Sequence, residues 1–430
     1  MLALASAGAW AETVRLDADA AAVRIVEVSY LAAANAARAE RADAGVAAAD
    51  AAKLPSISAS ASLGQRSSAP EFRLPLTLPG SEPLVLFPDI TTTYSAAVQV
   101  RQDLFTGGAI TATRTASRRE RDEVEAARLQ VRAELQLAAR LGYWEAVRAA
   151  AAGEVATARE ERALRLLADT RALADAGMAL RADLLAAEER LATARVGVLR
   201  AASAATQSLS QLRSLLHLPA GGAIELADTL AGALPPAPEE LTVLQELALQ
   251  RRPELTALAA HAGALKAREE LARAPSRPAL GALAQWDLAR PNQRYFPLAD
   301  EWSDSWSVGL AASWTLFDGG KARAEVASSQ AAQRALAAEH GEAARRIALE
   351  VEIGRIGQEN ALAVVAAADA ARAAADERER AARERYNAGL ATTVEILDAQ
   401  AGLAEAEQAQ IEARAGVWLA AARLAKAVGQ

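Results

Sequence analysis

Two segments of the chain alternate between apolar residues and small or polar residues at every second position. The first is "YSAAVQVR" at residues 94–101, and the second is "WSVGLAASWTL" at residues 306–316. Alternation with period two is typical of a β-strand with one apolar face. A Pro-led segment of similar length precedes each of them, "PSISASASLG" and "PALGALAQWDL". The sequence therefore predicts two β-hairpins, at about residues 55–104 and 278–316.

Long tracts rich in Ala, Arg, Glu and Leu follow both hairpins and indicate helices. Their apolar residues recur at helical spacing, for example at Leu137, Leu141, Trp144 and Val147. Residues 109–175 as one helix would be about 100 Å long, which is too long for an ordinary globular domain. Because Gly readily takes the left-handed conformation that ends a helix, we expect turns at Ala176-Gly177 and Ala388-Gly389. The pattern predicts long antiparallel coiled-coil helical hairpins.

One sequence motif, Leu-Phe-x-Gly-Gly, occurs at residues 104–108 and again at 316–320, which is 212 positions later (316 minus 104). Gly177 and Gly389 keep the same step (389 minus 177). This offset is far longer than the repeats of roughly 20 to 50 residues that build solenoids. Duplication of a half-molecule is the simpler interpretation.

The duplication predicts two structural repeats of one design with a Pro-rich equatorial segment between them. Each repeat is expected to contain a helix, a β-hairpin and a long helical hairpin. The expected parts are a signal-peptide remnant (1–11), the first repeat (12–218), the inter-repeat segment (219–250) and the second repeat (251–430). In the first repeat the β-hairpin is expected at about 55–104 and the helical hairpin at about 107–217. In the second repeat the β-hairpin is expected at about 278–316 and the helical hairpin at about 319–428.

Composition excludes several classes of function. The chain has no Cys, so thiolate metal sites and disulfides are excluded, and its three His residues have no neighbour at metal-ligand spacing. We therefore expect no metal and no cofactor. No Ser/His/Asp, Cys/His or phosphate-loop pattern indicates an enzyme. A formal net charge of −7, with Lys and Arg spread among Asp and Glu, argues against nucleic-acid binding.

The first residues, "MLALASAGAWAET", are similar to the end of a secretory signal peptide, with Ala9-Trp10-Ala11 as the cleavage site. No stretch of about 18 apolar residues predicts a transmembrane helix. If the chain crosses a membrane, it must therefore do so with strands. Aromatic residues such as Tyr94, Trp306 and Trp314 match the girdles of transmembrane β-strands. Four strands cannot close a useful barrel, and an open edge cannot stay in lipid, so oligomerisation becomes a requirement.

These features resemble the TolC-type outer membrane efflux protein family. The resemblance depends on the duplicated Leu-Phe-x-Gly-Gly, on the Pro-led strands after Lys53-Leu54 and Arg277, and on "RYNAGLATTVEILDAQAGLAEAE" at residues 385–407. The last segment is similar to the family's sequence at the periplasmic helix turn. The resemblance implies an α+β fold, with long antiparallel coiled-coil helical hairpins and two membrane β-hairpins per protomer. Three protomers would form a twelve-stranded β-barrel with a periplasmic α-helical tunnel.

The function implied by the resemblance is an exit duct in the outer membrane of a Gram-negative bacterium, with a large periplasmic portion. Such a duct contacts outer membrane lipid and works with a periplasmic adaptor (membrane fusion) protein and an inner-membrane ABC or proton-driven pump. Efflux of a drug or metal ion and type I protein secretion stay open, because the pump selects the substrate. An alternative from a different class is a periplasmic coiled-coil scaffold without channel activity.

The resemblance also implies candidate site residues near the two helix turns. Glu395 and Asp398 lie three apart, hence on one helix face, and match carboxylates at the family's periplasmic aperture. Asp183 matches an acidic residue that helps hold the aperture closed. Three copies of Glu395 and Asp398 would ring the axis and favour cations. The tips that match the adaptor docking site are Gly177, Ala388, Gly389 and Leu390.

Two observations weigh against a simple transfer of these roles. Thr392 and Glu395 also fit a capping box at the start of the last helix, which would give Glu395 a purely structural role. Ala391 stands where family members can carry an Arg that links to the acid at Asp183, and Arg181 is a candidate substitute. The sequence does not show which contact keeps the aperture closed.

Overall fold

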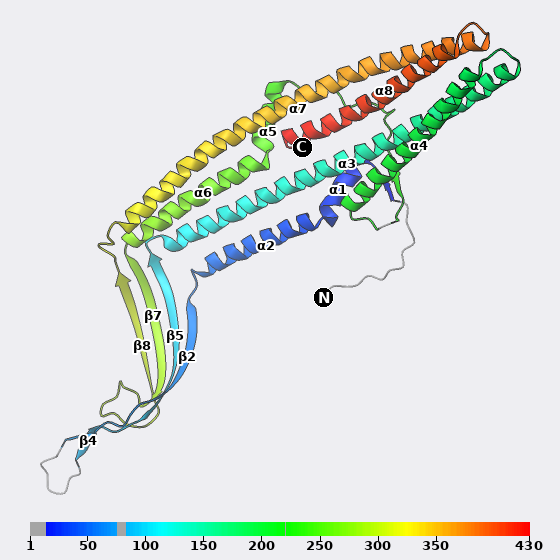
Figure 1. Ribbon diagram of the computed structural model, residues 1–430. Helices are drawn as coiled ribbons and strands as arrows, with labels where there is room; N and C mark the ends of the chain where they lie inside the picture. The colour runs from blue at the N-terminus through cyan, green and yellow to red at the C-terminus, as the bar shows by residue number, and fades with distance from the viewer. Residues whose placement is uncertain (1–13, 75–82, 220) are drawn as a thin grey trace. The chain divides into compact units, whose positions relative to one another are not determined.

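A computed structural model gives the fold for residues 14–74, 83–219 and 221–430. The expected signal-peptide remnant at 1–11 lies outside the described residues. Long helices and shorter strands alternate along the chain (Figure 1). The helices are α1 (Ala18–Val28), α2 (Tyr30–Ala51), α3 (Ala109–Asp175), α4 (Arg181–Leu215), α5 (Leu241–Arg251), α6 (Pro253–Arg273), α7 (Lys321–Asn387) and α8 (Thr393–Val428). The strands are β1 (Val14–Leu16), β2 (Ser56–Gln65), β3 (Phe72–Leu74), β4 (Leu84–Phe87), β5 (Thr92–Thr106), β6 (Ile224–Leu226), β7 (Ala279–Arg290) and β8 (Ser303–Ser313).

The single helix expected at residues 109–175 is α3, and α7 has the same length of 67 residues. Both helices lack Pro and are rich in strong helix formers, so nothing in their sequences interrupts the backbone hydrogen bonds. Gly177 and Gly389 follow them with φ of 75° and 73°, in the left-handed region that ends a helix. The duplicated Gly pairs before the helices also have positive φ, from 62° at Gly107 to 95° at Gly108.

The described chain divides into two compact units. The strand unit comprises residues 39–124 and 258–339, and the hairpin unit comprises residues up to 38 together with 125–257 and 340–430. Each unit takes segments from both halves of the duplicated sequence. The compact units therefore cut across the two expected repeats.

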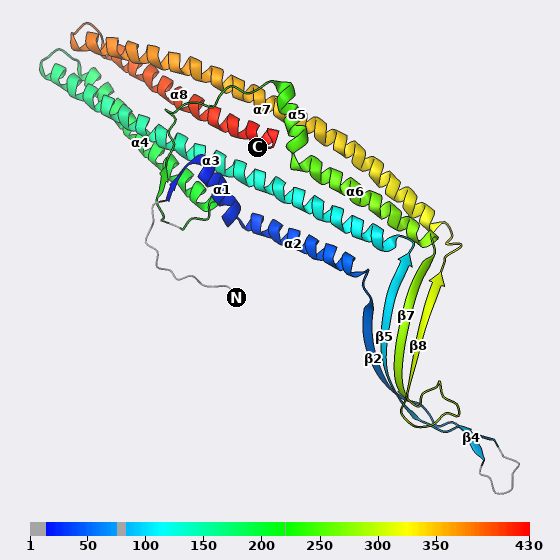
Figure 2. The ribbon, with the colours of Figure 1, turned by 180° about the vertical axis from the view of Figure 1, so that it is seen from behind.

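The strand unit contains a four-stranded antiparallel sheet in the order β2-β5-β7-β8 (Figure 2). β2 pairs with β5, β7 pairs with β8, and the β5–β7 pairing joins the two pairs. The segment between β2 and β5 also contains the short antiparallel pair β3–β4.

The sheet has one apolar and one polar face. Its register aligns one row of apolar residues across the four strands: Ala59, Val98, Trp286 and Trp306. The adjacent row points to the other face and is polar: Ser58, Gln99, Gln285 and Ser307. Trp306 is 71% exposed and Val308 is 72% exposed, so no described element covers the apolar side of β8.

β2 and β8 are the outer strands, and each pairs on one side only. β5 has partners on both sides and runs through the first Leu-Phe pair to Thr106. β8 instead ends at Ser313, so Leu316 and Phe317 of the second copy lie outside any strand and are highly exposed. The duplicated motif thus has two different conformations: the first copy continues beside β7 as far as Thr106, whereas β8 ends at Ser313, opposite the first residue of its partner β7.

The hairpin unit is built around aromatic residues of α3 and α8. Trp144 stacks on Trp418, with ring centroids 4.2 Å apart. Beside them the buried Tyr143 hydroxyl donates to the Leu16 carbonyl oxygen and accepts from the Asp228 amide, both at 3.1 Å. These bonds hold β1, which pairs in parallel with β6, against α3. No sequence pattern predicts this small sheet, since each of its strands has only three residues.

A buried arginine fastens the C-terminal end of α8 within the same unit. Arg252 donates to the carbonyl oxygens of Lys426 and Ala427 at 3.1 and 3.2 Å. It also pairs with Glu254 at 2.8 Å and with Glu350 at 2.9 Å. Lys426 reaches Glu350 at 2.9 Å. One guanidinium therefore joins the start of α6 to α7 and α8.

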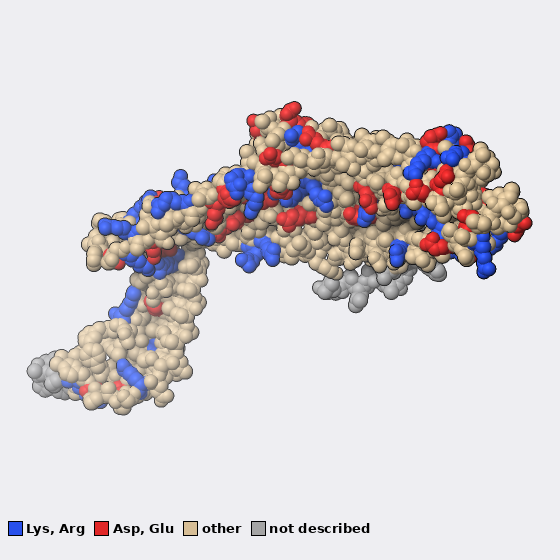
Figure 3. All heavy atoms as spheres, turned by 45° about the horizontal axis from the view of Figure 1, so that its top comes forward, with Lys and Arg blue, Asp and Glu red and all other residues tan. Residues whose placement is uncertain are grey.

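Among the described residues, no single helix has both the length and the apolar composition needed to cross a membrane. The pair α1 and α2 passes together by length and composition only, with a bend of 53° between them. On the face shown in Figure 3, most of the charged side chains lie on the helices. The strands carry few charged side chains on that face.

Candidate functional site

The first helix turn carries two of the expected site residues. Gly177 is exposed, and its amide and that of Met178 donate to Ala174 and Leu173, which closes the end of α3. Asp183 lies in the first turn of α4, where its carboxylate accepts the Leu180 amide at 3.0 Å. This bond satisfies an amide that the helix leaves unpaired. Asp183 thus has a structural role that the sequence analysis did not assign to it.

The second helix turn carries the remaining tip residues. Ala388, Gly389 and Leu390 are all exposed, and Leu390 donates its amide to the Arg385 carbonyl oxygen at 2.8 Å. Thr392 caps α8 by accepting the Glu395 amide at 3.3 Å. One half of the predicted capping box is therefore present, while the Glu395 carboxylate accepts from the Thr392 hydroxyl at 3.4 Å.

The two candidate aperture acids of α8, Glu395 and Asp398, each face an arginine of α7. Glu395 pairs with Arg385 at 3.2 Å, and Asp398 pairs with Arg378. All four side chains are largely exposed, so the pairs are weak by themselves. Their effect is electrostatic. Within one chain, each carboxylate has a cation beside it, which reduces the negative field that the acids alone would produce.

A buried hydrogen bond connects the two helical hairpins near these turns. The hydroxyl groups of Thr170 on α3 and Tyr386 on α7 lie 2.8 Å apart. Tyr386 packs with Leu166 and Ile396, and Ala391 contacts this cluster. The small side chain at the position where relatives can carry an Arg therefore packs against an apolar cluster. Arg181, the suggested substitute, forms no ion pair with any residue in the described ranges.

Sequence reasoning missed this contact because Thr170 and Tyr386 are 216 positions apart. In the sequence, Tyr386 stands out only as part of the segment at residues 385–407. A signal did exist, since a Tyr in a helix of Ala, Arg and Glu needs both a packing site and a partner for its hydroxyl. Nothing in the sequence identified Thr170 as that partner.

Comparison with known proteins decides the family. The profile of the outer membrane efflux protein family matches residues 30–217 and 244–430, which is most of the chain. The chain belongs to the outer membrane efflux protein family. The resemblance stated from the sequence is thereby confirmed, and so is the outer membrane as the location of this efflux protein.

Solved structures of outer membrane channels share its fold. CusC is 17% identical, with a TM-score of 0.79, and the match covers 99% of this chain and 95% of CusC. VceC from Vibrio cholerae is 18% identical, with a TM-score of 0.75 and 96% of each chain covered. The open state of the Neisseria gonorrhoeae MtrE channel is 18% identical, with a TM-score of 0.76, and the match covers 96% of this chain and 88% of MtrE. A search of curated proteins gives no match.

Proposed function

We propose that this efflux protein assembles as a homotrimer into an exit duct for efflux or type I protein secretion, working with a periplasmic adaptor and an inner-membrane pump. The four-stranded sheet carries the proposal, because it has two uncovered faces of opposite character and two unpaired edges. The family and the fold of its solved relatives support it.

The sheet is suited to a boundary between lipid and water. The face with Val98, Trp286 and Trp306 can meet hydrocarbon, and the face with Gln99, Gln285 and Ser307 can meet water. Unpaired backbone groups at β2 and β8 would cost several kcal/mol each in lipid. Pairing of β8 in one copy with β2 in the next removes that cost. Three copies would close a twelve-stranded β-barrel, and their helices would continue it as a periplasmic α-helical tunnel.

The helix turns are the proposed periplasmic end of this duct. We assign the aperture to Asp183, Glu395 and Asp398, and adaptor docking to the exposed tips, which are Gly177, Ala388, Gly389 and Leu390. Because Arg385 and Arg378 partner Glu395 and Asp398, we expect the cation preference of the aperture to be moderate. Removing an arginine partner should strengthen that preference, and removing the carboxylates should abolish it.

The experiment combines a mass measurement with conductance. Purified full-length protein in detergent, measured by light scattering corrected for detergent, should have a mass about three times 44.9 kDa. In planar bilayers it should form channels whose reversal potential shows a preference for cations. The variant Glu395→Gln/Asp398→Asn should lose the preference, and Arg378→Gln should increase it. Arg380→Gln is the matched control, since Arg380 pairs with Glu377 on its own helix.

The outcomes separate the parts of the proposal. A water-soluble monomer without conductance would contradict the duct and favour the scaffold alternative. A trimeric channel whose ion preference is the same in all four proteins would retain the duct and remove the aperture assignment.

A further inference from the structure

A concentration of positive charge in the hairpin unit lies between α3, α4 and α8, away from the helix turns. Four arginines line a cavity of about 330 Å³ here: Arg159 and Arg162 from α3, and Arg190 and Arg200 from α4. None of the described residues that line it is Asp or Glu. The α8 side contributes Gln400 and Gln408. A cluster of cations is unexpected in a chain whose formal net charge is −7.

A single carboxylate partly balances the cluster. Glu407, buried beside the cavity, pairs with Arg162 at 2.6 Å and lies 3.8 Å from Arg159. Arg190 and Arg200 form no ion pair with any residue of the described chain. Four guanidinium groups therefore share one carboxylate. Mutual repulsion of this kind is costly unless an anion or water screens it.

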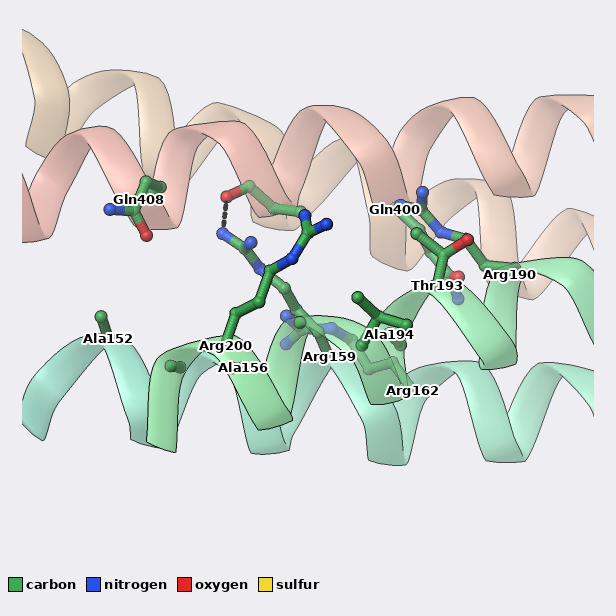
Figure 4. A pocket seen from close by; sticks show the side chains of 14 residues that line it. Ala152, Ala156, Arg159, Arg162, Arg190, Thr193, Ala194, Arg200, Gln400 and Gln408 are labelled. Carbon is green, nitrogen blue, oxygen red and sulfur yellow. Dashed lines mark hydrogen bonds between the residues drawn. The ribbon is translucent and has the colours of Figure 1, made fainter. Parts of the chain in front are cut away.

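Arg159 shows the imbalance most clearly. Its terminal nitrogen donates to the Ala404 carbonyl oxygen (Figure 4). Its Nε atom is buried without a hydrogen-bond partner among the described residues, although buried donors are nearly always paired. Burial lowers the pKa of Arg159, and Arg162 and Arg190 lower it further against the opposing attraction of Glu407. An added negative charge would relieve both the repulsion and the unpaired donor.

The size and lining of the cavity suit a polyatomic anion better than a monatomic one. Figure 4 shows the Arg159 and Arg200 side chains extending from α3 and α4 into the same space beneath α8, with Arg190 beside Gln400. A volume of about 330 Å³ corresponds to roughly ten water molecules at about 30 Å³ each. Guanidinium groups present forked donors that match the paired oxygens of carboxylates and phosphates.

We propose that this arginine pocket binds a small multivalent oxyanion, a polycarboxylate or polyphosphate, through Arg159, Arg190 and Arg200. Gln400, whose amide nitrogen donates to Glu379 at 3.5 Å, borders the pocket at the α8 side. Binding there ties α8 to the α3–α4 hairpin, so the anion also stabilises the hairpin unit. The inference does not depend on trimer formation or conduction.

Calorimetric titration of the purified full-length protein tests the proposal, with pyrophosphate and citrate as separate probes in a low-salt buffer free of metal ions. We expect saturable binding of one anion per chain and a rise in melting temperature. Arg190→Gln/Arg200→Gln should weaken the affinity at least about tenfold, equivalent to about 1.4 kcal/mol. Arg195→Gln, the matched control, should change it less than about twofold, since Arg195 lies on α4 but pairs with Glu160 outside the cavity lining.

A single variant provides a second test in case the double variant Arg190→Gln/Arg200→Gln folds poorly. Arg200 is exposed, so the single variant Arg200→Gln should keep the wild-type circular dichroism spectrum and still lose part of the affinity. Absence of saturable binding to wild type up to about 10 mM of either probe, a Kd that corresponds to only about −2.7 kcal/mol, overturns the proposal. Equal losses in Arg195→Gln and Arg190→Gln/Arg200→Gln also overturn it, because they show that general surface charge attracts the anion.

Discussion

Gly107 stands where β5 gives way to α3, and two independent constraints select Gly there. Its φ of 62° is one that side chains with a Cβ rarely adopt. A Cβ at this position would also lie 2.6 Å from the Ala274 carbonyl oxygen and 2.9 Å from the Arg277 Cβ. Gly319, its counterpart in the duplicated motif, has a φ of 69° but open space around it.

We therefore expect Gly107→Ala to destabilise the protein more than Gly319→Ala. Both variants force an alanine into the left-handed backbone conformation, which lowers the free energy of unfolding by about 1–2 kcal/mol. Only Gly107→Ala also adds a clash with backbone, of the kind that typically costs a further 1–3 kcal/mol. Thermal unfolding followed by far-UV circular dichroism compares the two. Equal melting temperatures would show that the Ala274 backbone moves away without penalty.

At the scale of elements, the Arg252 cluster joins α6, α7 and α8 by charge as well as by packing. Burial alone would raise the pKa of Glu350, but hydrogen bonds from Lys426 and Arg252 outweigh it and hold the pKa below its usual value of 4.5. A carboxyl whose pKa is lower in the folded chain than in the unfolded chain stabilises the fold above the unfolded value. That contribution is lost as the pH falls through the folded pKa.

Glu350→Gln should accordingly lower the melting temperature at pH 7, and the difference from wild type should shrink as the pH falls below about 4.5. Melting curves across this range measure the effect. Glu342→Gln is the control, because Glu342 pairs with Arg345 on an exposed helix face, where a pair contributes less than about 1 kcal/mol. A gap between Glu350→Gln and wild type that stays constant with pH would contradict the assigned charge state.

At the scale of the whole molecule, two neighbouring residues of β8 report which environment each face of the sheet meets. Val308 belongs to the apolar face, and Ser307 belongs to the polar face. In an outer membrane protein the first should contact lipid and the second should contact water. The same substitution at the two positions therefore has opposite expected outcomes.

Val308→Arg should reduce the amount of folded protein in the outer membrane fraction, since an arginine facing lipid costs about 2–4 kcal/mol near the bilayer centre. Ser307→Arg, one residue away, should leave that amount close to wild type. Quantitative blots of heat-resistant protein in membrane fractions compare the two variants. If both variants insert equally well, the apolar face does not meet lipid.

The sequence was sufficient where local signals are strong. Strong helix formers without Pro, bounded by Gly107-Gly108 and Gly177, predicted the full extent of α3. Period-two alternation located β5 and β8, although β8 ends at Ser313 because its partner β7 begins opposite that residue, at Ala279. These features depend on residues close together in the chain.

Features that depend on distant residues were not accessible in this way. The β5–β7 pairing, the Thr170–Tyr386 hydrogen bond and the four-arginine cavity each join segments that only the packed fold brings together. The partners of the predicted acids were equally hidden, since Arg378 and Asp398 are 20 positions apart across a turn. Charge at the candidate aperture therefore could not be assessed from Glu395 and Asp398 alone.

A newly exported copy of this chain would cross an aqueous compartment with the outer edges of β2 and β8 unpaired and with Trp306 and Val308 exposed. Such surfaces adhere to any chain that offers a strand edge. Collisions between copies become more frequent as their number rises, whereas insertion sites stay limited. Overproduction of the protein is thus expected to yield aggregates in place of additional membrane-inserted protein. The rate of synthesis that the cell tolerates is then limited by the rate of insertion into the outer membrane.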